Sequence, residues 1–199
     1  MHSLDDQKLQ SIDVSFLGRE AARVVDFWFG PLPREQRPVW FEKNDAFDAA
    51  IRDGFASLHE LAVSGVCDAM ASDPRGSLAL VIVLDQFSRN LFRGDPKAFA
   101  WDDTALSHAR RAIDRGFAPA LPVVERQFLY MPFQHSEDLT VQAESVALFE
   151  TIGEHALGFA RRHQEIIERF GRFPHRNAVL GRESTAEELK FLEEPNSSF

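Results

Sequence analysis

The chain has 199 residues, the length of one ordinary globular domain, and 44% of its residues are hydrophobic. That share is sufficient to build a core and excludes an intrinsically disordered chain. The formal net charge of −9 opposes binding to nucleic-acid phosphates, and neither an export signal nor a membrane-spanning segment is predicted. We therefore expect a cytoplasmic globular protein without nucleic-acid or membrane partners.

The first 15 residues lack a regular pattern of apolar positions and are predicted to be a disordered or frayed tail. A single helical domain is predicted over residues 16–199. Within residues 20–29 the apolar positions recur at helical spacing, and Gly30 and Pro31 end that helix. The domain is therefore expected to begin with a helix that has one apolar face.

Two further helices are predicted in the first half of the chain. Asn44 or Asp45 is expected to cap a helix whose apolar stripe runs over residues 47–62. Residues 78–91 are the most apolar segment and are predicted to form a buried helix. The single cysteine, Cys67, has no basic neighbour and no chelating partner, so we expect an inert thiol in a reducing compartment.

The second half of the chain is also predicted to be helical. The expected helices cover residues 99–115, 121–130 and 139–170, the last as one long helix or as two nearly collinear ones with a weak point around residues 153–158. Pro132 is expected to stop the second of them, and Ser184 with Glu187 resembles a capping box for a final short helix. No segment alternates with a period of two, so no strand is expected. Short connections favour antiparallel helix pairs, and the predicted fold class is all-α.

The segment LDQFSRNLFRG, residues 84–94, follows two helical turns that are apolar on every side. In a helix its polar residues share one face, and they are candidates for ligand binding: Asp85, Gln86, Arg89, Asn90 and Arg93. Asp85 and Arg89 also have the spacing of an intrahelical ion pair. Because buried polar groups need partners, this face must meet either water in a cleft or side chains from another segment.

The segment ERQFLYMPFQHSED, residues 125–138, contains a turn rich in aromatic residues. Arg126 is a candidate ligand-binding residue, and His135 could form an acid/base pair with Glu137 or Asp138. A pair of metal ligands is the competing interpretation, but neither HExxH nor another ligand spacing is present, so no metal or cofactor is predicted. The histidines that lie singly on helical segments are expected to be surface or packed residues: His59, His108, His155 and His163.

Arginine is concentrated in the segment IIERFGRFPHRNAVLGR, residues 166–182. Its candidate ligand-binding residues are Arg172, Arg176 and Asn177. His175 is a candidate catalytic residue, because imidazole exchanges protons near neutral pH. Arginine presents a planar set of donors that suits carboxylate or phosphate, so a site for a small anion is predicted. Alternatively, these arginines form salt bridges to Asp85 or Glu137 that hold the C-terminal segment in place.

These three segments resemble an uncharacterised bacterial family, domain of unknown function nine-twenty-four. The likeness covers about residues 21–199 and includes VVDFWFG and WFEKNDAFD near the start. Ser88 departs from it, since proline is commoner there in the family. The resemblance implies an α–α superhelix of the tetratricopeptide-like class, although the tetratricopeptide consensus residues are absent. It implies no established activity.

Three functions are compatible with these patterns. The first is a cleft that binds a small anionic molecule, in which His135 or His175 moves a proton. The second is a protein- or peptide-binding module, because stacked helix pairs form concave grooves. The third is a purely structural network of arginines and carboxylates. The sequence favours the first, but it identifies neither the ligand nor the oligomeric state and does not decide whether the protein is an enzyme.

Overall fold

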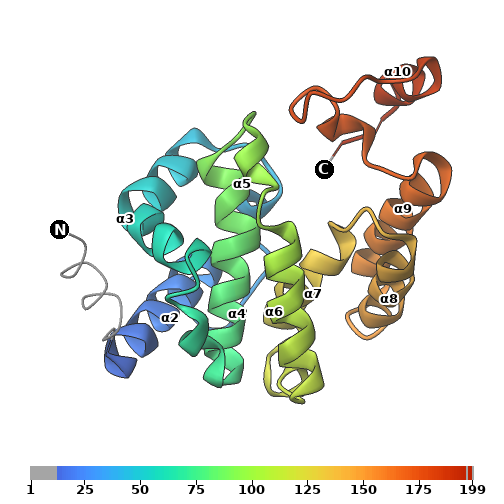
Figure 1. Ribbon diagram of the computed structural model, residues 1–199. Coiled ribbons are helices and arrows are strands. Elements are labelled where there is room, and N and C mark those ends of the chain that lie inside the picture. Colours follow the sequence, from blue (N-terminus) through green and yellow to red (C-terminus); the bar gives the residue numbers. More distant parts are fainter. Residues whose placement is uncertain (1–12, 196, 199) are drawn as a thin grey trace.

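The structure is a computed structural model that describes residues 13–195, 197 and 198. All regular elements in these residues are helical, as predicted, and no strand occurs among them. The helices follow one another across the molecule in chain order, from α2 (Val14–Phe29) to α10 (Ala186–Leu192) (Figure 1). Within the described ranges, no helix combines the length and apolar character needed to cross a membrane.

Helix α2 begins at Val14 because the Asp13 side chain accepts a hydrogen bond from the Ser15 amide and caps the helix. The predicted tail lies mostly in residues 1–12, which are outside the described residues. Its last two residues belong to α2 instead, so the helix starts earlier than predicted. The cap and Leu17 account for this difference, because Leu17 is buried and extends the apolar face by one turn before Ala21.

Helix α3 (Asp45–Val63) begins as predicted, with the Asn44 side chain accepting from the Phe47 amide at 2.9 Å. The most apolar segment forms α4 (Pro74–Ile82), a π-helical turn, η3 (Val83–Phe87), and α5 (Ser88–Leu91). It runs through the middle of the molecule, and residues 76–88 are all buried (Figure 1). Only glycine fits at position 76, since a Cβ on Gly76 would lie 1.9 Å from a backbone oxygen.

The remaining long helices are α6 (Asp102–Asp114), α7 (Val123–Gln134), α8 (Leu139–Phe149) and α9 (Glu154–Phe170). One predicted boundary is wrong. Helix α7 continues through Pro132. An interior proline removes one backbone hydrogen bond, and the buried residues around it keep the helix packed nevertheless. Residues 139–170 form two helices, one of the two predicted arrangements, and the break falls in the predicted weak segment, where Gly153 has φ of 138°, outside the helical region.

Helix α10 is capped by Thr185 and Glu188, one residue later than the predicted Ser184 and Glu187. The Thr185 hydroxyl accepts from the Glu188 amide at 3.2 Å, and the Glu188 carboxylate accepts from the Thr185 amide at 2.7 Å. Ser184 Oγ instead accepts a hydrogen bond from Asn177 at 3.0 Å. Short 3-10 turns occupy several connections: η1 (Pro38–Trp40), η2 (Asp68–Ser72), η4 (Pro96–Ala98), η5 (Ala118–Ala120) and η6 (Pro174–Arg176).

The main core contains many of the aromatic rings. The ring of Phe128 in α7 lies 4.7 Å from Trp40 and 5.5 Å from Trp28, measured between centroids. These contacts join the first helices to the middle of the chain. A second and smaller core lies near the C-terminus: Ile166, Ile167, Phe173 and Phe191.

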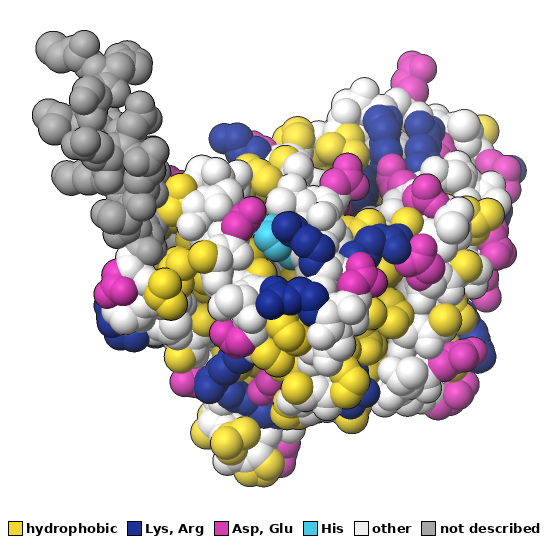
Figure 2. All heavy atoms as spheres, turned by 60° about the horizontal axis from the view of Figure 1, so that its bottom comes forward, with side chains coloured by type: hydrophobic (Ala, Val, Ile, Leu, Met, Phe, Trp, Pro, Cys, Tyr) yellow, Lys and Arg dark blue, Asp and Glu magenta, His cyan; other side chains and the backbone are white. Residues whose placement is uncertain are grey.

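Neighbouring helices pack in chain order, with α6 against α7, α7 against α8 and α8 against α9. Their arrangement as a tetratricopeptide-like superhelix and the assignment of residues 16–199 to one domain stay predictions. On the face shown in Figure 2, basic and acidic side chains are interspersed among apolar ones. The net charge of −9 is therefore not gathered into one acidic patch on that face.

Candidate functional site

The three polar segments meet where the end of α7 lies beside the π-helical turn and η6. His135 Nδ1 lies 2.7 Å from Asp85 Oδ1, and Arg176 Nη2 donates to the carbonyl oxygen of His135 at 3.0 Å. Asp102 and Arg89 join the same network through the arginine side chains. We call these five residues, Asp85, Arg89, Asp102, His135 and Arg176, the Asp85–His135 cluster.

Asp85 is the most buried member of the cluster, with no exposed surface. Its carboxylate accepts hydrogen bonds from Gln86 Nε2 at 2.6 Å, His135 Nδ1 at 2.7 Å and Arg89 Nη1 at 3.0 Å. Burial alone would raise the pKa of Asp85, but Arg89 and His135 favour the charged form more strongly and hold that pKa well below its usual range. Asp85 is therefore a buried carboxylate that is charged at neutral pH.

His135 is oriented by this carboxylate. Because Asp85 is charged, Nδ1 of His135 carries the proton and donates it, which leaves Nε2 as the nitrogen able to accept a proton. Burial and Arg89 lower the pKa of His135, and Asp85 opposes this shift only in part. The imidazole is therefore neutral near pH 7.

The two arginines of the cluster share Asp102. Its Oδ2 accepts from Arg89 Nη2 at 3.0 Å and from Arg176 Nη1 at 3.1 Å. The Arg176 guanidinium also lies over the rings of Phe99 and Phe173, 4.6 and 4.7 Å from their centroids. Burial lowers the pKa of Arg176 to about 10, so it is charged at neutral pH. Two guanidinium groups and two carboxylates thus balance the charge of the cluster.

Two more histidines lie beside the cluster. The ring centroid of His163 is 6.3 Å from that of His135, and its Nδ1 is 2.8 Å from the carbonyl oxygen of Phe159. Burial lowers the pKa of His163 to about 3 and, together with Arg176, lowers that of His175 to about 4. His163 is a packed residue, as expected, but the sequence does not indicate that it packs next to a polar site.

The structure corrects the predicted partner of His135. The Glu137 carboxylate accepts from Arg182 at 2.7 and 3.0 Å and from a backbone amide of the C-terminal segment at 2.7 Å. Asp138 caps the start of α8. Neither carboxylate pairs with His135, because both are bound to backbone or to arginine, and the partner is Asp85, 50 positions earlier in the chain.

The polar face of the first segment is divided between two places. Gln86 donates to Asp85 at 2.6 Å and so contacts the cluster. Asn90 Nδ2 and Arg93 Nη2 instead donate to Asp48 Oδ1 in α3, at 2.7 and 3.0 Å. Asn90 and Arg93 thus fasten α3 to the end of the central helix, and their ligand-binding role stays a prediction.

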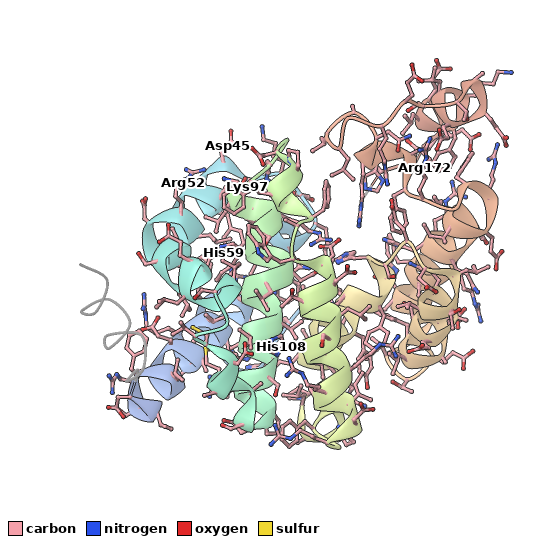
Figure 3. The ribbon with its side chains drawn as sticks, in the orientation of Figure 1. Asp45, Arg52, His59, Lys97, His108 and Arg172 are labelled. Atoms are coloured by element: carbon pink, nitrogen blue, oxygen red, sulfur yellow. The ribbon has the colours of Figure 1, made fainter. Side chains whose placement is uncertain are left out.

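Three further candidates lie away from the cluster. Arg172 donates to the Glu188 carboxylate at 2.7 and 2.8 Å and lies in the C-terminal part of the molecule (Figure 3). Asn177 Oδ1 accepts from Arg182 Nε at 3.0 Å. Arg126 lies in α7, and its Nε is buried without a hydrogen-bond partner among the described residues. The contacts of Arg172 and Asn177 lie within the C-terminal segment. The predicted salt bridge to Glu137 is formed by Arg182 instead.

Sequence reasoning missed Asp102. It is the first residue of α6, where an acidic side chain is common because it interacts favourably with the helix N-terminus. Only the tertiary structure brings Arg89 and Arg176 to it. The available signal was indirect: the excess of arginine in two polar segments required carboxylates from elsewhere in the chain.

Two cavities of about 310 Å³ each lie elsewhere, one between the end of α3 and α6 and the other between α6 and α8. Solvent reaches the cluster at its side chains, since the exposed fraction is 20% for Arg89 and 14% each for His135 and Asp102. The cluster is therefore partly open to water without belonging to either cavity. No group of three or more His, Cys, Asp or Glu side chains is arranged to hold a metal ion in the ranges that the structure describes.

Comparison with known proteins gives relatives of unknown function. Residues 24–196 match the family described as bacterial proteins of unknown function, DUF924. A solved structure of the protein of unknown function ATU0120 from Agrobacterium tumefaciens is similar, with 42% sequence identity and a TM-score of 0.84 over 89% of this chain and 99% of that chain. None of the curated proteins compared with the chain matches it. The chain belongs to the DUF924 family.

Proposed function

We propose that the Asp85–His135 cluster binds a small anionic molecule and that His135 exchanges a proton with it. The 2.7 Å contact between His135 Nδ1 and Asp85 Oδ1 carries the proposal. A carboxylate that fixes one imidazole nitrogen leaves the other nitrogen as a base of defined orientation, the division of roles found in many acid/base sites. The π-helical turn that carries Asp85 supports the same proposal, because such turns often occur at functional sites.

The arginines supply the attraction for an anion. A guanidinium has five N–H donors, and Arg176 uses one nitrogen for Asp102 and another for the His135 carbonyl oxygen. A carboxylate or phosphate bound next to His135 would share the donors of Arg89 and Arg176 with Asp102. Its charge would face two cations, and a proton on the bound molecule would face Nε2 of His135.

A purely structural role is the second candidate, and the charge balance of the cluster favours it. Two arginines face two carboxylates, so the network is electrically satisfied without a ligand. The two candidates differ in the effect of a conservative change at Arg176. Replacement by lysine retains the charge in both cases, but it removes the planar donor set that an anion would bind.

The test is a titration of the protein with inorganic phosphate and with succinate, followed through the imidazole resonances of His135. We expect saturable shifts in the wild type and binding at least tenfold weaker in Arg176→Lys. Arg93→Lys is the matched control, since it changes an arginine of the separate Asp48 network and should bind the anion as the wild type does. The proposal would be rejected in favour of the structural role by either of two results. One is that no phosphate or carboxylate of a panel shifts the His135 resonances, and the other is that Arg176→Lys and Arg93→Lys weaken anion binding equally.

We further propose a cytoplasmic location. Cys67 supports it, because it is buried, and burial raises the pKa of its thiol to about 11, so it is an unreactive thiol. A peptide partner held in a tetratricopeptide-like superhelix is the remaining proposal. Recovery of a specific partner whose binding is unaffected by phosphate would favour that proposal over an anion site.

A further inference from the structure

The cavity between α3 and α6 is built from residues that take no part in the Asp85–His135 cluster. Its volume of about 310 Å³ is at the lower end of the range for small-molecule sites. One wall is apolar and comes from the end of α3. The polar lining residues are Asp68, Asp103, Thr104, Ser107, His108 and Arg111.

Most of these polar side chains lie on one stripe of α6. Thr104, His108 and Arg111 follow one another at spacings of four and three residues, which places them on the same helix face. His108 is almost completely buried, with 2% of its surface exposed, and lies on the side of α6 that faces α4 (Figure 3). The exposed polar lining residues therefore surround His108, whose burial restricts its movement.

His108 contacts both a cation and an anion. Arg111 Nη2 lies 3.1 Å from His108 Nδ1 and 3.3 Å from its Nε2, and Asp68 Oδ1 lies 3.4 Å from the same Nε2. Burial and Arg111 lower the pKa of His108, so the ring is neutral at pH 7. The imidazole thus adds no charge to the cavity lining.

Arg111 differs from its neighbour Arg110. Arg110 is paired with Glu144, with Nη2 of the arginine 3.0 Å from Oε1 of the glutamate. In the part of the chain that the structure describes, Arg111 forms no salt bridge, and its guanidinium contacts the ring of His108. It therefore retains donors for a carboxylate at this end of the cavity.

The two carboxylates of the lining lie at different places. Asp103 lies two helical turns before Arg111, a separation of roughly 12 Å along the helix axis, whereas Asp68 contacts the same ring nitrogen of His108 as Arg111 does. Two carboxylates, one guanidinium and a neutral imidazole give the lining an excess of one negative charge. A ligand that matches it carries one net positive charge and has its anionic group at the Arg111 end.

We propose that this cavity binds an amino acid with a cationic side chain, such as lysine. Arg111 and the Ser107 hydroxyl bind its carboxylate, Asp68 beside Arg111 binds the neighbouring α-ammonium group, and Asp103 binds the ammonium group of the side chain. This site is separate from the proposed anion site, since no lining residue belongs to the Asp85–His135 cluster.

The test is calorimetric titration of the full chain with L-lysine. We expect saturable binding to the wild type and at least tenfold weaker binding to Arg111→Ala, which loses the carboxylate contact. Thr104→Trp places a large side chain in the cavity and should abolish binding. Arg110→Ala is the matched control on the same helix and should bind lysine as the wild type does.

Two analogues separate the charges of the ligand. 1,5-Diaminopentane lacks the carboxylate and should bind the wild type as weakly as lysine binds Arg111→Ala, whereas glutarate should not bind. Saturable binding of lysine to Thr104→Trp, equal binding of the diamine and lysine, or absence of lysine binding overturns the proposal. Asp103→Asn, a change at an exposed position, gives an independent variant with an intact fold and should also weaken lysine binding.

Discussion

Helices α2 to α7 pack through aromatic rings, whereas the segment from η6 to α10 is attached through arginine side chains. In the first region Trp28, Trp40 and Phe128 contact one another at centroid distances between 4.7 and 6.2 Å. In the second region Arg172 and Arg182 each bind a carboxylate through two nitrogen–oxygen contacts. Aromatic packing does not depend on protonation and ion pairs do, so the two regions should differ in their response to acid and to substitution.

The Asp85–His135 cluster lies on the border between these regions. Asp85 and His135 are attached to the main core through the central helix and the end of α7. Arg176 comes from the C-terminal segment and binds Asp102 and the backbone of His135. Loosening the C-terminal segment would therefore remove one cation from the cluster while leaving the oriented histidine in place.

The largest effect is expected from Phe128→Ala, which tests the aromatic side of the comparison. Phe128 is 1% exposed and contacts three other aromatic rings. Its removal leaves a cavity, and we expect the free energy of unfolding to fall by about 3–5 kcal/mol. Urea denaturation followed by circular dichroism measures the change. Phe41→Ala changes a side chain that is 60% exposed and should lower the free energy of unfolding much less. Equal decreases in the two variants would contradict the assignment of the core.

The aromatic core was largely predictable because it depends on local patterns. Apolar residues at helical spacing predict α3 and α4, and Asn44 predicts where α3 begins. The failures were also local. Pro132 does not end α7, and Asp13 starts α2 before the apolar pattern begins. In both cases tertiary packing or a cap outweighs the propensity of single residues.

The cluster was predictable only in part, because its partners are distant in the chain. The sequence identifies Asp85, His135 and Arg176 as candidates, and the structure brings these three together. It gives no basis for choosing Asp85 over Glu137 as the partner of His135, since spacing carries no information between separate helices. The role of Asp102 depends in the same way on contacts with residues from two other segments.

The second effect is a loss of stability in mild acid. His163 and His175 contribute to it near the C-terminal segment, and His59, whose pKa burial lowers to about 4, contributes in the main core. Burial lowers the pKa of His163 to about 3 and that of His175 to about 4, so the folded protein binds fewer protons than the unfolded chain below about pH 6.5. Stability is therefore lost as the pH falls through that value. Each histidine contributes a loss of up to about 1.4 kcal/mol per pH unit until its folded pKa is reached.

Hydrogen–deuterium exchange between about pH 6.5 and pH 5 measures this loss region by region, since carboxylates with ordinary unfolded pKa values titrate mainly below that range. Amides of residues 172–192 should lose protection before those of residues 76–88. His163→Gln removes one titrating group and should reduce the dependence on pH, whereas His155→Gln, at an exposed position, should not. Simultaneous loss of protection in both ranges would show that the two regions unfold as one unit.

The smallest of the three effects is expected from Arg182→Ala, which tests the ionic side of the comparison. Arg182 donates to both oxygens of Glu137, at 2.7 and 3.0 Å, and the side chains are 24% and 27% exposed. Its removal leaves a partly buried carboxylate bound only by a backbone amide, at an expected cost of about 1–3 kcal/mol. We expect this cost to appear as faster hydrogen–deuterium exchange of the amides of residues 172–192. The midpoint of global urea unfolding should remain almost unchanged.

Arg110→Ala shows whether burial decides the effect of an ion pair. Arg110 and Glu144 are 40% and 39% exposed, so water screens their attraction and the variant should lose at most about 1 kcal/mol. Both variants remove one arginine from one glutamate, and the pairs differ in exposure and in the segment that they attach. Arg182→Ala also removes hydrogen bonds to Asn177 Oδ1 and to the Phe173 carbonyl oxygen. Because Arg182 holds a segment with only a small core of its own, its loss should also move Arg176 and weaken anion binding at the cluster. If Arg110→Ala has the same effect on residues 172–192, the attachment of the C-terminal segment cannot be assigned to its own arginine contacts.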